Sequence, residues 1–290
     1  MQNENIYTIQ ADQIPYKLKE IPQPPKLLNI IGNLPRQDSK ILCVVGSRDY
    51  SSYGEEVCKK IISGLSGYDI CIVSGLARGI DGIAHRAALD AGLQTVAFPG
   101  SGLDENVLYP KQNRRLADEI VYKGGGLVSE YNNNMRAQDW MFPQRNRLMA
   151  GICDATLIVE ASIKSGTLIT ARLALDYNRN VGIIPGSIFS ILSEGPHSLV
   201  RAGAMQITSS EDVLELLGIN ERQSHAIQGN LLLDLNEIEK KIVDQLQIEP
   251  YNAEQLVLRL ELSPREINET LSLLEIRGIV TEKNGKFKLI

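Results

Sequence analysis

The chain has 290 residues, of which 43% are hydrophobic and 22% charged, and its formal net charge is −5. This length and composition exclude a fibrous or disordered chain and predict a globular protein of about two domains. Because the net charge is negative, a nucleic-acid site would have to gather its basic residues locally. No apolar run reaches the roughly 18–20 residues that span a bilayer, and the start MQNENIYTIQADQ lacks the pattern of a signal peptide.

The cysteines are Cys43, Cys58, Cys71 and Cys153, and no two of them form a CxxC pair. Two of them, Cys43 and Cys71, lie inside apolar runs that predict strands. The pattern therefore predicts reduced, buried thiols, with no metal site, and favours a cytoplasmic protein.

Residues 1–40 carry five prolines, which exclude a long helix. We predict an extended lead-in that packs on the next domain, and these forty residues are too few for a separate helical domain.

Residues 41–218 alternate short apolar runs with helical patterns. Strands are predicted at ILCVVG (41–46), ICIVSG (70–75), QTVAFPG (94–100), GLVSE (126–130), ATLIVE (155–160) and VGIIPG (181–186). Helices are predicted at 54–65, 81–92, 143–150, 167–178 and 210–217. Continuous apolar strands between amphipathic helices indicate an α/β domain with a parallel sheet covered on both faces.

The pattern changes after a polar linker at residues 219–230. Residues 231–290 predict helices at 236–247, 252–262 and 263–278, with Asn252 and Ser263 at N-caps, Glu266 completing a capping box and Gly278 at the end. A hairpin around Asn284-Gly285 follows, so this domain is predicted to be a winged helix-turn-helix. It carries eight Lys and Arg against eleven Asp and Glu. A helix that reads a DNA groove is normally more basic, so a protein-interaction or regulatory role is at least as well supported as duplex binding.

Ligands of an open parallel sheet bind beyond the carboxyl ends of its strands. The first predicted strand ends in Gly46-Ser47-Arg48, where the glycine admits a ligand and the guanidinium suits a phosphate or a base. Taken alone, Arg48 would rather be assigned to a surface salt bridge.

The second strand ends in SGLARGID, in which Gly75, Arg78 and Gly79 offer backbone N–H groups and a cation before a helix. The loop is neither GxGxxG nor GxxxxGK[ST], so it does not indicate a dinucleotide site or a P-loop. We predict that Asp81 is an N-cap and that His85 is packed or solvated rather than facing a ligand.

Two more loops add stackable rings, hydroxyls and cations. Trp140 and Phe142 lie beside Arg145, Asn146 and Arg147, a combination suited to single strands, although the rings could equally belong to the core. The other loop precedes a predicted helix and contains Lys164, Ser165, Gly166 and Thr167. Together with a turn at residues 185–187, these loops predict an anion-binding surface at one edge of the sheet.

Five blocks closely resemble the signature motifs of the DNA-processing protein A (DprA/Smf) family. They are VVGSR (44–48), SGLARGID (74–81), FPQRNRLMAG (142–151), EASIKSGTLIT (160–170) and IPGS (184–187). The resemblance covers about residues 41–217, and residues 231–290 resemble the C-terminal module of many relatives.

This resemblance implies an extended Rossmann-like domain that binds single-stranded DNA without strong sequence preference and is not an enzyme. It also implies protection of incoming strands in natural transformation, loading of the RecA recombinase and a homodimer, with no required cofactor or metal. The matching positions for the DNA pocket are Gly46, Ser47, Arg48, Phe142, Arg145, Asn146, Lys164 and Ser165.

The sequence departs from the family pattern at two places. Residues 102–110 read GLDENVLYP, two residues longer than the GLDxxYP of many relatives. Asp139 stands where relatives often have a basic residue before the FP pair, so we expect one phosphate contact fewer.

Two enzyme classes compete with this interpretation. A nucleoside-phosphate hydrolase of the lysine-decarboxylase-like (LOG) group would need a PGGxGTxxE loop with a catalytic glutamate, whereas the corresponding loop here is IKSGTLIT. Glu160 precedes this loop, and we predict a structural role for it. A nicotinamide-dependent oxidoreductase would need GxGxxG after the first strand, which is absent from the sequence.

Overall fold

The computed structural model describes residues 6–219, 235–246, 249–260, 262–276, 279–283 and 285–289. The chain divides into two compact units, Met1–Glu221 and Arg222–Ile290. Residues 220–230 of the predicted linker lie outside the described residues, as do Gly278 and Asn284 at the predicted helix end and hairpin turn.

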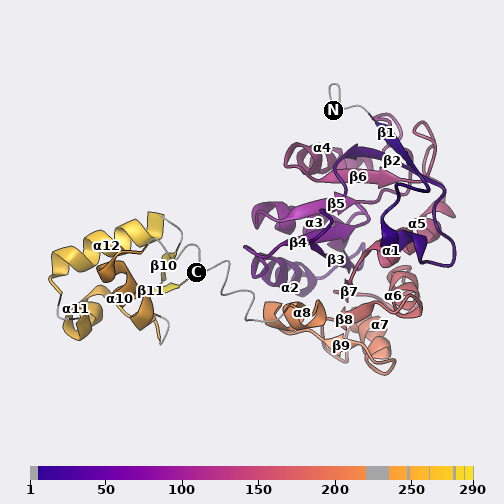
Figure 1. Ribbon diagram of the computed structural model, residues 1–290. Helices are drawn as coiled ribbons and strands as arrows, with labels where there is room; N and C mark the ends of the chain where they lie inside the picture. The colour runs from indigo at the N-terminus through magenta and orange to yellow at the C-terminus, as the bar shows by residue number, and fades with distance from the viewer. Residues whose placement is uncertain are drawn as a thin grey trace. The chain divides into compact units, whose positions relative to one another are not determined.

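The described part of the first unit is built on one nine-stranded sheet (Figure 1), in the order β1-β2-β6-β5-β4-β3-β7-β8-β9. Its strands are β1 Tyr7–Gln10, β2 Leu27–Gly32, β3 Lys40–Val45, β4 Ile70–Ser74, β5 Gln94–Ala97, β6 Gly126–Ser129, β7 Ala155–Ile158, β8 Asn180–Ile183 and β9 Met205–Gln206. The strands from β6 to β9 in this order pair in parallel, whereas β1 and β2 are antiparallel to their neighbours.

Helices cover both faces of the sheet (Figure 1). One face carries α2 Ser52–Ser63, α3 Ile80–Asp90, α4 Arg114–Tyr122 and α8 Ser210–Leu216, and the other carries α1 Tyr16–Lys19, α5 Met141–Ile152, α6 Thr167–Asp176 and α7 Ile191–Val200. A short 3-10 turn, η1 Lys111–Asn113, precedes α4. The predicted Rossmann-like α/β fold is therefore confirmed.

The central strand β3 shows why its apolar sequence is continuous. Ile41, Cys43 and Val45 enter the core on one face, and Leu42 and Val44 enter the core on the other. Alternate side chains of a strand point to opposite faces, so a strand buried on both sides must be apolar throughout. All four cysteines are buried and free, as the sequence predicted.

The N-terminal segment differs from the extended lead-in that its prolines suggested. It contributes β1, β2 and the helical turn α1 to the first unit. Pro15 stands before α1, the next three prolines lie between α1 and β2, and Pro35 follows β2. The prolines thus mark the boundaries of short elements. Helices α4 and α7 and strand β9 were not predicted from the sequence, and α7 contains Pro196, which hides its helical pattern.

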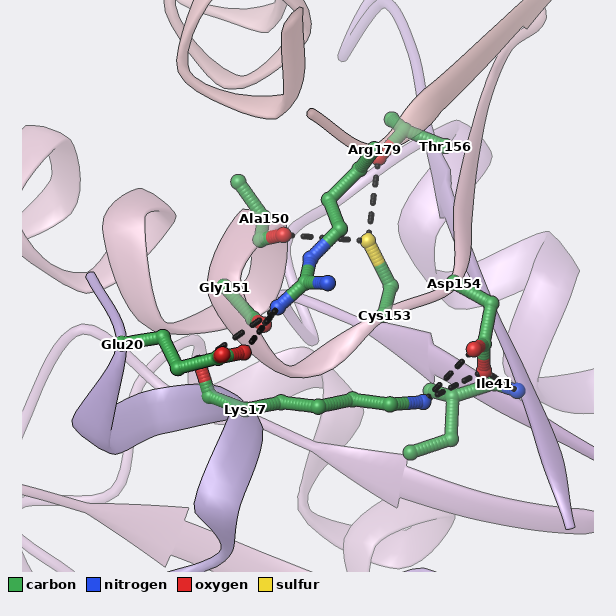
Figure 2. A network of polar contacts seen from close by, with 9 residues as sticks. All are labelled: Lys17, Glu20, Ile41, Ala150, Gly151, Cys153, Asp154, Thr156 and Arg179. Atoms are coloured by element: carbon green, nitrogen blue, oxygen red, sulfur yellow. Dashed lines mark hydrogen bonds and ion pairs between the residues drawn. The ribbon is translucent and has the colours of Figure 1, made fainter. Parts of the chain in front are cut away.

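A polar network (Figure 2) fixes α1 at the amino ends of β3 and β7. The loops with the predicted site follow the other ends of these strands. Both carboxylate oxygens of Asp154 lie 2.7 Å from Lys17 Nζ, and one also accepts the Ile41 N–H at 2.8 Å. Arg179 donates to the Gly151 carbonyl at 3.1 Å and pairs with Glu20 at 3.8 Å. These bonds join the N-terminal segment to the α5–β7 turn.

We expect Asp154→Ala to destabilise the first unit by about 1–3 kcal/mol, because a partly buried ammonium and a backbone N–H lose their acceptor. Urea denaturation followed by the fluorescence of Trp140, the single tryptophan, measures this change. Lys19→Ala is the control, since Lys19 is exposed and donates to the Asp12 carbonyl, outside this network. Equal stability of both variants would contradict the assignment.

The described residues of the second unit form a winged helix. Helices α10 Glu237–Leu246, α11 Ala253–Leu260 and α12 Pro264–Ile276 precede the hairpin of β10 Val280–Lys283 and β11 Lys286–Leu289. The predicted capping box is present: Glu266 N donates to Ser263 Oγ at 3.3 Å, and Ser263 N donates to the Glu266 carboxylate at 2.9 Å. On α12, Arg265 is paired with Glu269 at 2.7 Å, so the charge of this arginine is balanced within the helix.

Candidate nucleic-acid interface

The candidate site lies where the strand order of the sheet reverses. From β3 the chain adds β4 and β5 on one side, whereas β7, β8 and β9 follow on the other side. The loops after β3 and β7 therefore diverge and leave a crevice, the position at which open α/β sheets bind ligands. A groove of about 410 Å³ occupies this place, between the loop after β3, the start of α5 and the start of α6.

The groove brings together nine of the predicted site residues: Gly46, Ser47, Arg48, Phe142, Arg145, Asn146, Ser165, Gly166 and Thr167. Five others do not line it: Gly75, Arg78, Gly79, Arg147 and Lys164. Lys164 and Arg78 are exposed on neighbouring loops. Three separate parts of the chain therefore meet in one groove.

Arg48 and Phe142 contact each other inside the groove. The Arg48 guanidinium carbon lies 5.3 Å from the centroid of the Phe142 ring, within the range of a cation–π contact. Among the described residues no ion pair joins Arg48 to Asp49 or to another carboxylate. The exposed guanidinium is therefore available to a ligand rather than neutralised in a surface salt bridge.

The start of α6 forms the opposite wall. Thr167 Oγ1 donates to the Gly46 carbonyl at 3.0 Å, which ties this helix to the loop after β3. Ser165 Oγ accepts the Thr167 N–H at 3.2 Å. The N-terminus of a ten-residue helix carries partial positive charge, so this wall favours an anion although it contains no cationic side chain.

Arg145 is buried rather than presented to solvent, with 5% of its surface exposed. Its guanidinium donates to the Gly75 carbonyl at 2.6 Å and to the Phe98 carbonyl. Asp81 accepts the Gly75 N–H at 3.1 Å, so Gly75 is held from both sides. A Cβ at Gly75 would lie 2.5–2.6 Å from these two side chains, which explains the glycine.

Asp81 is not the N-cap that the sequence predicted. The N-cap of α3 is Gly79, and the Asp81 carboxylate bonds backward to Gly75 N and Ala77 N. Burial raises the pKa of Asp81, and the positive charge of Arg145 lowers it. Gly79 has φ +81°, and a Cβ there would lie 2.3 Å from the Ser47 carbonyl oxygen. The loop between β4 and α3 therefore packs against the loop that carries Arg48.

His85 is packed, as expected: it is fully buried, and Nδ1 lies 2.7 Å from Thr95 Oγ1. Burial, aided by the charge of Arg145, lowers the pKa of His85 to about 3 from its usual 6.5. Between these values the unfolded state binds the proton and the folded state does not. The contribution of neutral His85 to the free energy of unfolding is thus fully present above pH 6.5 and is lost as the pH falls toward 3.

We therefore expect the free energy of unfolding to fall less steeply between pH 6.5 and pH 4 in His85→Gln than in the wild type. Urea denaturation at a series of pH values measures the slope, and His197→Gln serves as the control. Parallel pH profiles for wild type and His85→Gln would contradict a neutral buried His85.

Glu160 has the structural role that the sequence predicted. Its carboxylate accepts Ser51 N at 2.9 Å and Ser51 Oγ at 2.5 Å, at the N-cap of α2. Arg147 is paired with Glu130 and donates to the Gln23 carbonyl at 2.7 Å, away from the groove. Trp140 is 50% exposed and meets Tyr131 edge-on, so the alternative that placed this ring in the core is wrong.

Tyr109, which was not predicted to be a site residue, packs against Phe142 of the groove. The long loop that precedes it is anchored on the segment after β6: Gly102 N donates to Met135 O at 2.8 Å, and Asp104 N donates to Asn133 O at 3.0 Å. Leu103 and Leu108 are buried beneath the loop. Tyr109 then lies 5.7 Å from Phe142, ring centroid to ring centroid. Only the YP pair of the family pattern marked this position.

Two further observations concern metal binding and membrane insertion in the described residues. No three His, Cys, Asp or Glu side chains within them are grouped so as to hold a metal ion. In the same part of the chain, no helix has the length and apolar character needed to cross a bilayer.

Comparison with known proteins places this architecture in a defined class. Residues 5–218 match the family model of the DNA recombination-mediator protein A, and residues 231–286 match the DprA winged helix domain. The DNA processing protein DprA of Streptococcus pneumoniae is 44% identical over 210 residues, which cover 72% of each chain. Protein Smf of Escherichia coli is 40% identical over 219 residues, and the match spans 75% of this chain but 58% of the relative.

Two solved structures share the fold of the first unit. The DprA of Streptococcus pneumoniae superposes with a TM-score of 0.68 at 41% identity, over 73% of this chain and 74% of that one. The DprA of Helicobacter pylori, whose structure describes a single-stranded DNA binding mode, gives 0.65 at 27% identity, over 74% and 98%.

The fold thus defines a Rossmann-like α/β protein with a C-terminal winged helix domain. The chain belongs to the DNA processing protein A (DprA/Smf) family.

Proposed function

We propose that the chain binds single-stranded DNA in the groove at the strand-order reversal. The observation that carries this proposal is the meeting of an exposed guanidinium, an aromatic ring and a helix N-terminus in that groove. Phosphates suit the cation and the helix end, and unpaired bases suit the flat surfaces of Arg48 and the aromatic rings. The binding mode described for the Helicobacter pylori relative supports the same ligand.

Single strands should bind more tightly than duplex of the same length, because paired bases cannot stack on the groove. Fluorescence anisotropy with labelled oligo(dT) and with a matched duplex, at several salt concentrations, tests this expectation. The affinity for single strands should fall steeply with salt, because phosphate contacts release counterions. Equal affinities for both forms at moderate salt would refute the proposal.

The finer role follows the family. We propose that the protein protects incoming single strands during natural transformation and delivers them to the RecA recombinase in the cytoplasm. Four free, buried cysteines fit a reducing compartment. The acidic winged helix domain serves this role better as a contact for another protein than as a duplex reader.

We further propose that the protein acts as a homodimer. Between β8 and α7, and at the start of α7, Ile188, Phe189 and Ile191 are 80%, 92% and 68% exposed. Large apolar side chains gathered on a surface are typical of protein contacts. A second copy of the chain is the partner that family membership favours.

The proposed function is binding rather than catalysis. The LOG-type alternative needs a free glutamate near the phosphate loop, and Glu160 is instead committed to Ser51. Asp81, a carboxylate in the wall of the groove, is committed to the backbone of residues 75–77. An assay for hydrolysis of nucleoside monophosphates, run beside the DNA titration, distinguishes the two functions.

A further inference from the structure

The Phe142 ring is largely covered by other parts of the chain. The Arg48 guanidinium lies over it, and the backbone of Gly100 is so close that a Cβ there would be 2.4 Å from a Phe142 ring carbon. Tyr109 packs against it at 5.7 Å with the two ring planes tilted by 53°. A base could therefore reach the face of Phe142 that Arg48 covers only by displacing Arg48.

Tyr109 is the more accessible ring, with 42% of its surface exposed. The backbone of Tyr109 is fixed, because its N–H donates to Ser101 Oγ at 3.1 Å. Ser101 is held in turn, since its carbonyl accepts from Ser129 Oγ at 2.7 Å. The preceding Leu108 is buried. A ring that is held at its backbone and open at its side is suited to stacking with little loss of conformational entropy.

Arg48 presents a second flat surface. A planar guanidinium that lies over an aromatic ring can also stack on a base. Phe142 contacts both Arg48 and Tyr109, so these two surfaces neighbour the same ring. Single-strand binders use successive flat surfaces of this kind, and such stacking tolerates any base.

We propose that Tyr109 and Arg48 each stack on a different base of the bound strand, and that Phe142, which contacts both side chains, holds them in position. The proposal rests on single-strand binding in the groove and adds Tyr109 to the residues that contact DNA. It assigns Phe142 the role of a positioning residue rather than a stacking surface.

The test uses the full chain and the shortest oligo(dT) that binds with full affinity, because a short strand cannot slide without losing contacts. A single abasic site is placed at each position in turn. Dissociation constants are measured by anisotropy for wild type, Tyr109→Ala, Arg48→Ala and Phe142→Leu. Tyr122→Ala, which removes an exposed tyrosine on α4, is the control.

On the intact oligonucleotide, Tyr109→Ala should weaken binding about 5- to 150-fold, the range for the loss of one stacked base. At one abasic position wild type and Tyr109→Ala should bind equally, while Arg48→Ala still binds more weakly. At a different abasic position, the difference in affinity between wild type and Arg48→Ala should become smaller. In Phe142→Leu, an abasic site at either of these two positions should weaken binding less than it does in the wild type.

Several results would overturn the proposal. One is wild-type affinity in Tyr109→Ala, and another is a loss in that variant that no abasic position removes. A third is a single abasic position that removes the effects of both variants, which would mean that Tyr109 only supports Arg48. Should Tyr109→Ala lose its folded circular dichroism, Tyr109→Leu and Tyr109→Phe replace it, and only the ring-containing variant should restore the affinity. Failure of wild type to bind oligo(dT) would instead refute the proposed function.

Discussion

Replacing Arg145 by alanine should lower the free energy of unfolding of the first unit by about 3–5 kcal/mol, the usual effect of removing one of two interacting buried charges. The carbonyls of Gly75 and Phe98 would lose their donor, and the buried carboxylate of Asp81 would lose its nearby positive charge. Urea denaturation followed by Trp140 fluorescence measures the change. Arg145→Lys keeps the charge but not the fork of donors, so it should recover part of the loss.

The matched control is Arg147→Ala, two residues along the same helix. Arg147 lies at a more accessible position, where it pairs with Glu130 and donates to Gln23 O, and its removal should cost less stability. If Arg145→Ala instead kept its stability and lost DNA affinity, Arg145 would be a direct phosphate ligand and its assignment as a buried support would be wrong.

The second large effect is expected at Arg48. Arg48→Ala should keep its melting temperature within a few degrees and lose about 1.5–3 kcal/mol of binding to single strands, the range for a hydrogen bond to a charged group. The reason is that the guanidinium is exposed in the groove and has no carboxylate partner among the described residues. A surface salt bridge would contribute only about 0–1 kcal/mol to stability and nothing to binding.

Arg48→Lys separates charge from shape at this position. Lysine keeps the positive charge but offers no planar surface, so it should restore only part of the affinity. Full affinity in Arg48→Ala would show that the loop after β3 does not contact the strand. The site would then have to be sought around Lys164 and the start of α6.

The groove could be predicted from the sequence because strand ends of a parallel sheet meet at one edge. Each apolar run predicts a buried strand. Because β3 and β7 are neighbours, the glycines, hydroxyls and cations that follow them lie together. The resemblance to family motifs identified the same loops. Position in the fold is therefore largely encoded by pattern and spacing.

The direction of individual side chains was not encoded in the same way. Arg145 and Arg147 are separated by one residue in the FPQRNR motif, and one is buried under the groove while the other faces the N-terminal segment. Helical geometry turns such positions by about 200°, but the sequence does not say which face meets which partner. Asp81 escaped prediction for a related reason, since the N–H groups that donate to its carboxylate lie in the preceding loop.

Tyr109 and the N-terminal strands show two other limits. Tyr109 follows a loop longer than the family pattern, so its distance to Phe142 depended on how that loop folds over Leu103 and Leu108. In residues 1–40 the prolines obscured the apolar run of β2, which becomes a strand because β6 offers it a pairing partner. In both regions tertiary contacts decide the structure rather than local composition.

Photo-crosslinking tests most directly whether the strand lies in the groove. An oligo(dT) with 5-bromodeoxyuridine at single positions is bound to the full chain and irradiated, and the crosslinked peptides are identified by mass spectrometry. Crosslinks are expected at the segments that carry Arg48, Tyr109 and Phe142, and an excess of unlabelled oligo(dT) should abolish them. Crosslinks confined to residues 235–289 would contradict this expectation and would place the DNA on the winged helix domain.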